Sequence, residues 1–407
     1  MHKTKSSRIP ILLATILFTS YSCKDEPTIK VKADFQYEKV ALQGESVQFQ
    51  DLSDGQPTSW SWTFEGGTPT ESTTQNPSTT YSKAGIYKVT LSVTNDQNTD
   101  TKTEDIEIVP QIEASFTSNL TSINQGSSIE FNDTSTGEPT SWKWTFPGGN
   151  PSTSNDPNPI VTFTSSGNHN VTLESSNKLS TSTFSSKILV LPTNGLIVYF
   201  PFNGNTNDLS DKGNDGINSG ASLSTDRFNN ADKAFRFDGV DDKIAFEYVS
   251  ELSNLPISIS FWVNFDELKS SILGTDINDY YQSGVWFSIG QSIETLGKLA
   301  LNFGNGGTPP GPGNRRTFLI DSPVEVNNWY HIVGIVENTN TMKIYIDGEE
   351  MTGTYSGFAN FFYHSTYNGN IGRVWDPNAF FKGSIDDFRI YNRVLAKSEV
   401  SLLNAEH

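Results

Sequence analysis

The chain has 407 residues, a formal net charge of -18 and a single cysteine. This length allows about two to four domains, and packed cores must stabilise them because one cysteine cannot form an internal disulfide. So acidic a chain repels nucleic acid and lacks the basic patch that phosphate binding requires, which excludes a nucleic acid as its partner. Gly, Pro, Asn, Ser and Thr are abundant and helical periodicity is nearly absent, so the composition predicts an all-β fold.

The first 22 residues have the layout of a secretory signal. Lys3, Lys5 and Arg8 precede an apolar run over residues 9–18, and small or polar residues follow. The apolar run is far shorter than the roughly 20 residues that a membrane-spanning helix needs. We therefore expect residues 1–22 to be cleaved, which changes the formal charge from -18 to -21.

Cys23 stands at the predicted cleavage point and is followed by Lys24, Asp25 and Glu26. This arrangement resembles the signal of a bacterial lipoprotein, with the lysine-plus-acid export tag of the Bacteroidetes group, although Ser20 stands where Leu is usual. The resemblance implies a palmitate-bearing lipid on Cys23 and anchoring in the outer membrane, facing the cell exterior. The alternative is a plain secretory signal beside an accidental cysteine.

An internal repeat of 82 residues occupies the next part of the chain. Trp60, Trp62 and Phe64 alternate with polar residues, which predicts a strand with one buried face. The repeated residues are Asp51, Pro57, Trp60, Trp62, Phe64, Gly66, Gly67, Pro69, Asn76, Pro77, Gly85, Val89 and Leu91, which recur at Asp133, Pro139, Trp142, Trp144, Phe146, Gly148, Gly149, Pro151, Asn158, Pro159, Gly167, Val171 and Leu173.

Both copies resemble the PKD (polycystic kidney disease) domain, an immunoglobulin-like sandwich. We assign residues 23–31 to a linker, 32–109 to the first copy and 110–192 to the second. The paired tryptophans could stack on sugars, but their shared facing with phenylalanine favours a place in the core. We therefore expect the two copies to act as spacers.

Residues 193–407 resemble a laminin-G-like, concanavalin A-like jelly roll. The resemblance rests on four stretches, namely 196–202, 234–242, 329–348 and 383–393. Ala396 stands where such domains usually carry the serine that caps a final helix, so the turn from Glu399 to Leu403 is expected to fray.

Catalytic patterns are missing from residues 193–407. A retaining glycosidase needs two carboxylates about 5–5.5 Å apart, yet no Glu-x-Asp-x-x-Glu string occurs. Asp386 and Asp387 are adjacent on a predicted strand, so only one carboxylate is expected to reach any one site. The five histidines lack metal-ligand spacing. The sequence therefore favours a protein that is not an enzyme.

Calcium is the cofactor that the acidic loops suit best, because this cation prefers six to eight oxygen ligands. Jelly rolls of this kind often hold one calcium between an early loop and the closing strand. The positions that fit one structural calcium are Asn207, Asp208, Asp238, Asp241 and Asp386. The alternative is that Asp238-Gly239 and Asp347-Gly348 form hairpin turns and that Asp386-Asp387 caps backbone amides.

Two aromatic segments with polar neighbours suit a glycan, since rings stack on the C–H faces of sugars and Asn, Asp and Arg bind their hydroxyls. The candidate glycan-binding residues are Tyr280, Tyr281, Trp286, Arg373, Trp375 and Asp376. Each ring could instead fill the core between the sheets.

Together these features predict a surface lipoprotein that captures polysaccharide through its C-terminal jelly roll. One alternative is an adhesin that binds a protein or another cell. Another is an enzyme with an unrecognised polysaccharide-cleaving site.

Overall fold

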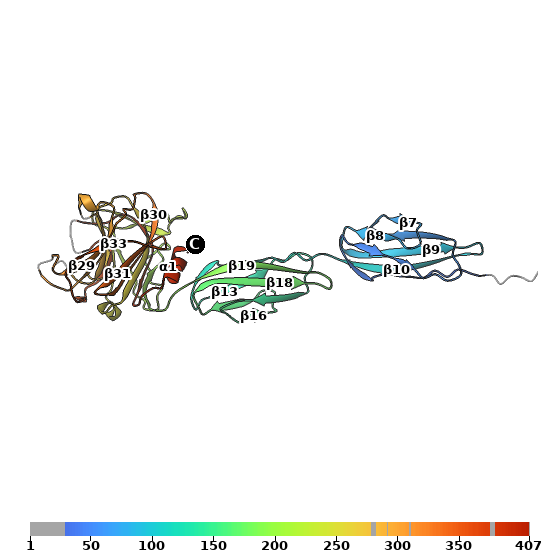
Figure 1. Cartoon of the computed structure of the whole chain (residues 1–407), viewed down its shortest axis with the longest axis horizontal. Coiled ribbons are helices and arrows are strands. Elements are labelled where there is room, and N and C mark those ends of the chain that lie inside the picture. Colours follow the sequence, from blue (N-terminus) through green and yellow to red (C-terminus); the bar gives the residue numbers. More distant parts are fainter. Residues whose placement is uncertain (1–28, 278–281, 291, 309–310, 375–378, 407) are drawn as a thin grey trace, which may run out of the picture. The chain divides into compact units, whose positions relative to one another are not determined.

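The computed structural model describes residues 29–406 except 278–281, 291, 309–310 and 375–378. Nearly all regular structure in it is β, as predicted, and each of the three predicted parts folds as a β-sandwich (Figure 1). The predicted lipoprotein signal, with Cys23, Lys24, Asp25 and Glu26, lies outside the described residues. No helix in the described part of the chain is long and apolar enough to cross a membrane.

The first sandwich packs a five-stranded sheet, in the order β2-β10-β9-β5-β7, with the sheet β3-β8-β6 and the pair β1-β4. Its strands are β1 (Phe35–Gln36), β2 (Val40–Leu42), β3 (Ser46–Gln48), β4 (Gln50–Asp51), β5 (Ser59–Phe64), β6 (Gly67–Thr68), β7 (Glu71–Ser72), β8 (Ser78–Tyr81), β9 (Gly85–Thr94) and β10 (Thr99–Val109). Trp62 and Phe64 are fully buried, as predicted. Trp60 packs at the edge of the core, and its indole donates to Asp51 Oδ2 at 2.8 Å.

The second sandwich repeats this pattern 82 residues further on. Its strands are β11 (Phe116–Ser118), β12 (Ser122–Asn124), β13 (Ser128–Asp133), β14 (Ser141–Thr145), β15 (Gly149–Asn150), β16 (Thr153–Ser154), β17 (Ile160–Phe163), β18 (Gly167–Ser176) and β19 (Thr181–Leu191). Trp144 is fully buried, and the Trp142 indole donates to Asp133 Oδ2 at 2.8 Å. The repeated tryptophans therefore belong to two equivalent cores.

The C-terminal domain consists of two eight-stranded sheets, which we call sheet A and sheet B. Sheet A contains β20 (Leu196–Phe200), β22 (Ser222–Ser224), β23 (Ala234–Asp238), β25 (Ile257–Phe265), β30 (Trp329–Asn338), β31 (Thr341–Ile346), β32 (Glu349–Glu350) and β35 (Lys382–Tyr391). Sheet B contains β21 (Ile217–Ser219), β24 (Lys243–Phe246), β26 (Ser270–Gly274), β27 (Val285–Ile289), β28 (Leu299–Gly304), β29 (Arg315–Ile320), β33 (Gly353–Gly357) and β34 (Gly369–Ile371). Two short 3-10 helices, η1 (Ser250–Ser253) and η2 (Ile293–Thr295), lie in loops.

A single apolar core holds the two sheets together. Phe261 of β25 meets Phe287 of β27 edge to face, with ring centroids 5.2 Å apart, and both rings are fully buried. Along β28, Leu299, Leu301 and Phe303 are also fully buried members of this core. Because side chains alternate along a strand, the residues between them lie on the outer face of sheet B.

The final helix, α1 (Lys397–Asn404), forms where the sequence predicted a frayed turn. Ala396 offers no side-chain cap, but the Glu399 carboxylate accepts a hydrogen bond from the Ala396 N–H at 2.9 Å. The same carboxylate pairs with Arg393 at 2.7 Å. Val400 and Leu403 are fully buried, so packing stabilises the helix where the serine cap is lost.

Candidate functional site

Four residues form a straight row across the outer face of sheet B. Trp286 of β27 is opposite Asn302 of β28, Asn302 is opposite Thr317 of β29, and Thr317 is opposite Ser356 of β33. We call these four residues the cross-strand row. Directly opposite residues on neighbouring strands lie about 4.5–5.5 Å apart, so the row presents an almost continuous line of polar groups beside one indole ring.

The cross-strand row lines a cavity of about 170 Å³, which we call the outer-face cavity. The other lining residues are Ser271, Ser288, Thr295, Lys298, Ala300, Arg315, Leu319 and Val374. The neighbouring row of opposite residues includes Ser271, Ser288 and Ala300. These small side chains leave space above the sheet, whereas long ones would fill it.

Hydrogen bonds hold the polar floor of the outer-face cavity in place. Thr317 Oγ1 donates to Asn302 Oδ1 at 2.7 Å, and Asn302 Nδ2 donates to the carbonyl oxygen of Ala300 at 3.2 Å. Asn302 is only 3% exposed and Thr317 only 8%. The amide is therefore fixed in one orientation before any ligand arrives, which lowers the entropy cost of binding.

Two cations and no carboxylate belong to the described lining of the outer-face cavity. Lys298 and Arg315 are among its twelve lining residues, none of which is Asp or Glu. Within the described ranges, neither side chain has a carboxylate at ion-pair distance. The site is thus polar and locally positive in a strongly acidic protein.

The predicted glycan-binding residues meet the outer-face cavity only in part. Trp286 lines it, although the ring is only 4% exposed. Arg373 precedes the lining residue Val374, and its guanidinium lies 6.0 Å from the ring centroid of Phe380. Tyr280, Tyr281, Trp375 and Asp376 fall outside the described residues, so their part in the site stays a prediction.

Sequence reasoning missed most of the cavity. The sequence pattern did not mark five of the lining residues as candidates, because their types are common in ordinary strands. These residues are Ser288, Asn302, Thr317, Lys298 and Arg315. The available signal was the polar residue placed between core residues, as in Leu301-Asn302-Phe303. Reading it requires the register of five strands, which the sequence alone did not provide.

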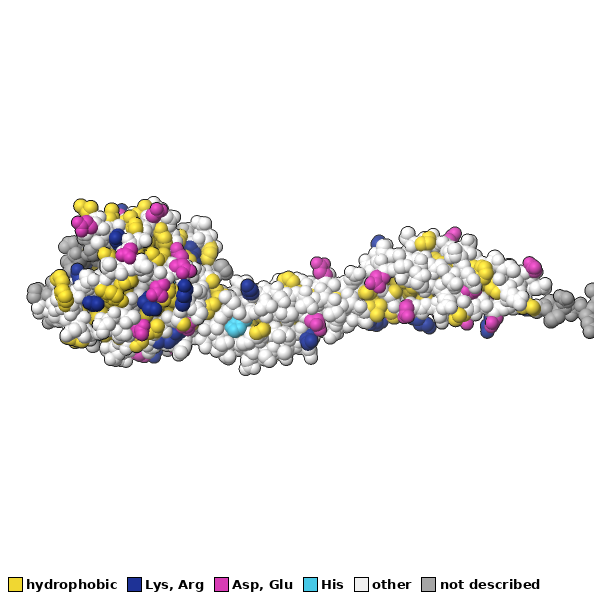
Figure 2. Space-filling view, viewed as in Figure 1, with side chains coloured by type: hydrophobic (Ala, Val, Ile, Leu, Met, Phe, Trp, Pro, Cys, Tyr) yellow, Lys and Arg dark blue, Asp and Glu magenta, His cyan; other side chains and the backbone are white. Residues whose placement is uncertain are grey.

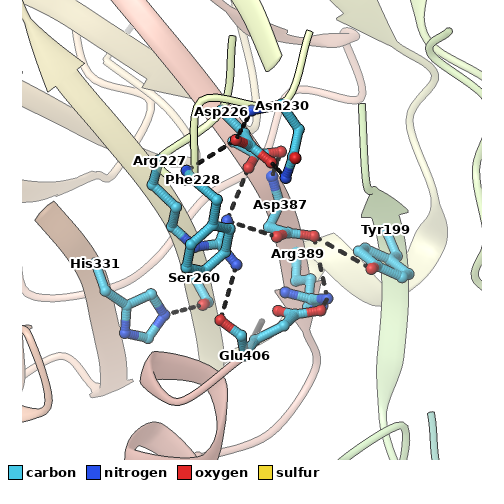
Figure 3. Close-up of polar contacts among 11 residues, drawn as sticks. Tyr199, Asp226, Arg227, Phe228, Asn230, Ser260, His331, Asp387, Arg389 and Glu406 are labelled. Atoms are coloured by element: carbon cyan, nitrogen blue, oxygen red, sulfur yellow. Dashed lines mark hydrogen bonds and ion pairs between the residues drawn. The ribbon is translucent and has the colours of Figure 1, made fainter. Parts of the chain in front are cut away.

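A second polar cluster lies inside the C-terminal domain (Figure 3). Arg227 Nη1 contacts Asp386 Oδ2 at 2.7 Å and Asp387 Oδ2 at 3.0 Å. Arg389 Nη2 pairs with Glu406 at 2.6 Å. We call these five residues, together with Tyr199, whose hydroxyl donates to Asp387 Oδ1 at 3.2 Å, the buried ion cluster.

The prediction that Asp386 and Asp387 could not reach one site is wrong. On β35, Arg389 is opposite Ser260 and Asp386 is opposite Trp262, so β35 has one residue more than β25 over this interval. The extra residue makes a β-bulge, and Asp387 has a φ of 47°, in the left-handed region. The bulge breaks the alternation of side chains and turns both carboxylates toward Arg227.

Charge and burial together set the protonation of the buried ion cluster. Three carboxyl groups face two guanidiniums, so one carboxyl lacks a cation of its own. Burial, aided by the charge of Asp387, raises the pKa of Asp386 to about 9. Burial also raises the pKa of Glu406 to about 7. The cluster therefore favours holding one extra proton near neutral pH.

The buried ion cluster connects separate segments of the C-terminal domain. Asp386 Oδ1 accepts the Asp387 N–H and its Oδ2 is held by Arg227, while both oxygens of Asp387 have partners. The cluster joins the first strand β20, the closing strand β35 and Glu406, which follows α1. Its carboxylates are engaged with the protein itself, so they serve to hold these segments together.

The five predicted calcium ligands do not come together. The Asp208 carboxylate accepts hydrogen bonds from the backbone N–H groups of Tyr199 and Asn214, at 2.8 and 2.9 Å, and Asp386 belongs to the buried ion cluster. In the described part of the chain, the acidic side chains close enough to share an ion are Asp238, Asp241 and Asp242.

Asp208 and Asp386 therefore lie outside this acidic group. Asn207 was predicted to share one calcium site with them. Asp386 Oδ1 accepts the Asp387 N–H at 2.8 Å, which agrees with the backbone capping that the sequence left open as the alternative. Calcium binding itself stays a prediction, with Asp238 and Asp241 as the members of the predicted set that are close together.

Family models match most of the described chain. The PKD domain model matches residues 29–108 and 113–190, and the model of the concanavalin A-like lectin/glucanases superfamily matches residues 238–401. Both family resemblances expected from the sequence are thereby confirmed. No curated protein matches the chain in sequence.

Several solved structures resemble about half of the chain. Domain 4 of AbnA, a GH43 extracellular arabinanase from Geobacillus stearothermophilus in complex with arabinotriose, is 21% identical, with coverage of 51% of this chain and 98% of that chain and a TM-score of 0.40. The botulinum neurotoxin serotype D binding domain is 16% identical, with coverage of 52% and 51% and a TM-score of 0.40. The match thus spans about half the length of that binding domain.

Proposed function

We propose that this chain, which carries two PKD domains followed by a domain of the concanavalin A-like lectin/glucanase superfamily, binds carbohydrate through the outer-face cavity of its C-terminal domain. The observation that carries the proposal is the cross-strand row. Its amide and hydroxyl groups can both donate and accept hydrogen bonds, as sugar hydroxyls require. The Trp286 ring beside them can contact the C–H face of a sugar.

The chemistry of the outer-face cavity supports binding without cleavage. A glycosidase of the usual kind places two carboxyl groups across its cleft, about 5–5.5 Å apart in a retaining enzyme. Among the residues that the structure describes, none that line this cavity is Asp or Glu. We therefore propose that the protein captures a polysaccharide and leaves its hydrolysis to other proteins.

A panel of soluble polysaccharides, titrated against the full chain, tests this function. At least one glycan should bind in the micromolar to millimolar range, about -8 to -4 kcal/mol. Asn302→Ala should weaken that binding by about tenfold, the equivalent of one lost hydrogen bond. The matched control is Asn338→Ala, an exposed asparagine at the end of β30 in sheet A, which should bind as the wild type does.

Binding to no glycan in the panel would contradict the proposal. It would favour the adhesin alternative, for which the segment 358–367 offers a surface. In that segment the rings of Phe358, Phe361, Tyr363 and Tyr367 are exposed. Equal glycan affinity of Asn302→Ala and wild type would place the site elsewhere on the protein.

We also propose that a lipid on Cys23 anchors the chain to the outer membrane and that the PKD domains act as spacers between the anchor and the binding domain. Cys23→Ala should move the protein from the membrane fraction to the soluble fraction of the cell. Immunoblotting of the two fractions measures the change. Unaltered membrane association of the variant would refute the lipid anchor.

A further inference from the structure

We infer that the glycan bound by the outer-face cavity is an acidic polysaccharide, one that carries carboxylate or sulfate groups on successive sugars. The inference rests on the proposed function and names the class of its ligand. The observation behind it is the pair of cations, Lys298 and Arg315, in a cavity whose described lining residues include no Asp or Glu.

Positive charge is scarce in this protein, where Asp and Glu number 46 and Lys and Arg 28. On the face shown in Figure 2, basic side chains of the C-terminal domain lie interspersed with acidic ones. Lys212, for example, pairs with Glu251 at 2.7 Å, and Lys382 pairs with Glu267 at 3.1 Å. Lys298 and Arg315 have no such partner among the described residues, so their charge is available to a ligand.

The two cations come from positions near opposite ends of β28. Arg315 is opposite Gly304, the last residue of β28, whereas Lys298 immediately precedes the first residue of that strand. Six residues of strand separate these positions, which corresponds to about 20 Å along the backbone. This backbone span exceeds one sugar ring, so an oligosaccharide with more than one negative group can contact both cations.

The polar floor lies between the cations. Ser288, Asn302 and Thr317 can bind hydroxyl groups of the intervening sugars, while Arg315 can hold a carboxylate or sulfate through two parallel hydrogen bonds. Lys298 supplies a point charge at the other end. A recess lined by one sign of charge also concentrates counter-ions, which favours capture of a polyanion despite the acidic remainder of the protein.

Titration of the full chain with matched acidic and neutral glycans tests this inference. The probes are polygalacturonate and its carboxyl-reduced neutral form, and dextran sulfate and dextran. We expect at least one acidic member to bind at least about tenfold more tightly than its neutral counterpart, and more weakly as salt increases. The polygalacturonate pair reports carboxylate recognition and the dextran pair reports sulfate recognition.

The double variant Lys298→Gln/Arg315→Gln should lose most of this preference, with at least a tenfold weaker affinity for the acidic glycan and a flatter salt dependence. The control Lys343→Gln/Arg316→Gln removes the same charge outside the outer-face cavity. Arg316 is next to Arg315 but on the other face of β29, where its guanidinium lies 4.9 Å from the Tyr355 ring centroid. Thermal unfolding of both variants verifies their folding, and the control should keep the wild-type preference.

Equal affinity for acidic and neutral forms would overturn this inference and leave the proposed function intact. So would an acidic preference that survives the Lys298→Gln/Arg315→Gln change in a folded protein. Failure to bind any glycan in the wider panel would overturn the proposed function and this inference together. A uronic acid monosaccharide should compete poorly with its oligosaccharide, and equal competition would refute the two-ended site.

Discussion

Replacing Arg389 with Met should lower the free energy of unfolding of the C-terminal domain by about 3–5 kcal/mol, because it breaks a buried ion pair and leaves its partner without a cation. Arg389 is 1% exposed and pairs with Glu406 at 2.6 Å. Its guanidinium also lies 3.9 Å from the Tyr199 ring centroid. Because a Met side chain fills a similar volume, the loss of stability reflects the missing ion pair more than a change in packing.

Scanning calorimetry of the full chain measures this effect. One unfolding transition should shift to lower temperature, and the transitions of the two PKD domains should stay in place. Arg236→Met is the matched control, because Arg236 is 48% exposed and pairs with Asp266 on the surface. Such a pair contributes about 0.2–1 kcal/mol. Equal destabilisation by the two substitutions would contradict the role of the buried ion cluster.

Much of the fold could be predicted because its signals are local and repeated. Trp62 and Trp144 alternate with polar residues and recur 82 positions apart, so their burial in two equivalent cores followed from period and spacing. Short stretches of consecutive residues indicated the family of the C-terminal domain. The final helix was misjudged, because its stability comes from the buried Val400 and Leu403 and from the Glu399 contacts rather than from a serine cap.

The sites depend on features that a sequence pattern does not contain. The pairing of Asp386 and Asp387 with Arg227 requires a β-bulge in β35, and strict alternation predicted the opposite. The cross-strand row joins residues from four strands, with up to 70 positions between its members. Trp286 was the one member of the cross-strand row whose residue type suggested a binding role. Strand register, not residue type, therefore determines the candidate site.

The most direct test of carbohydrate binding at the outer-face cavity is calorimetric titration of the full-length Ser356→Trp variant with the glycan that the wild type binds most tightly. Ser356 is an exposed residue of the edge strand β33, opposite Thr317, so an indole there can cover the cross-strand row without disturbing the core. Ser222→Trp makes the same change on β22, an exposed edge strand of sheet A. We predict that Ser356→Trp weakens binding by at least about tenfold, or about 1.4 kcal/mol, while Ser222→Trp binds like the wild type. Wild-type affinity in a folded Ser356→Trp protein would contradict glycan binding at this cavity.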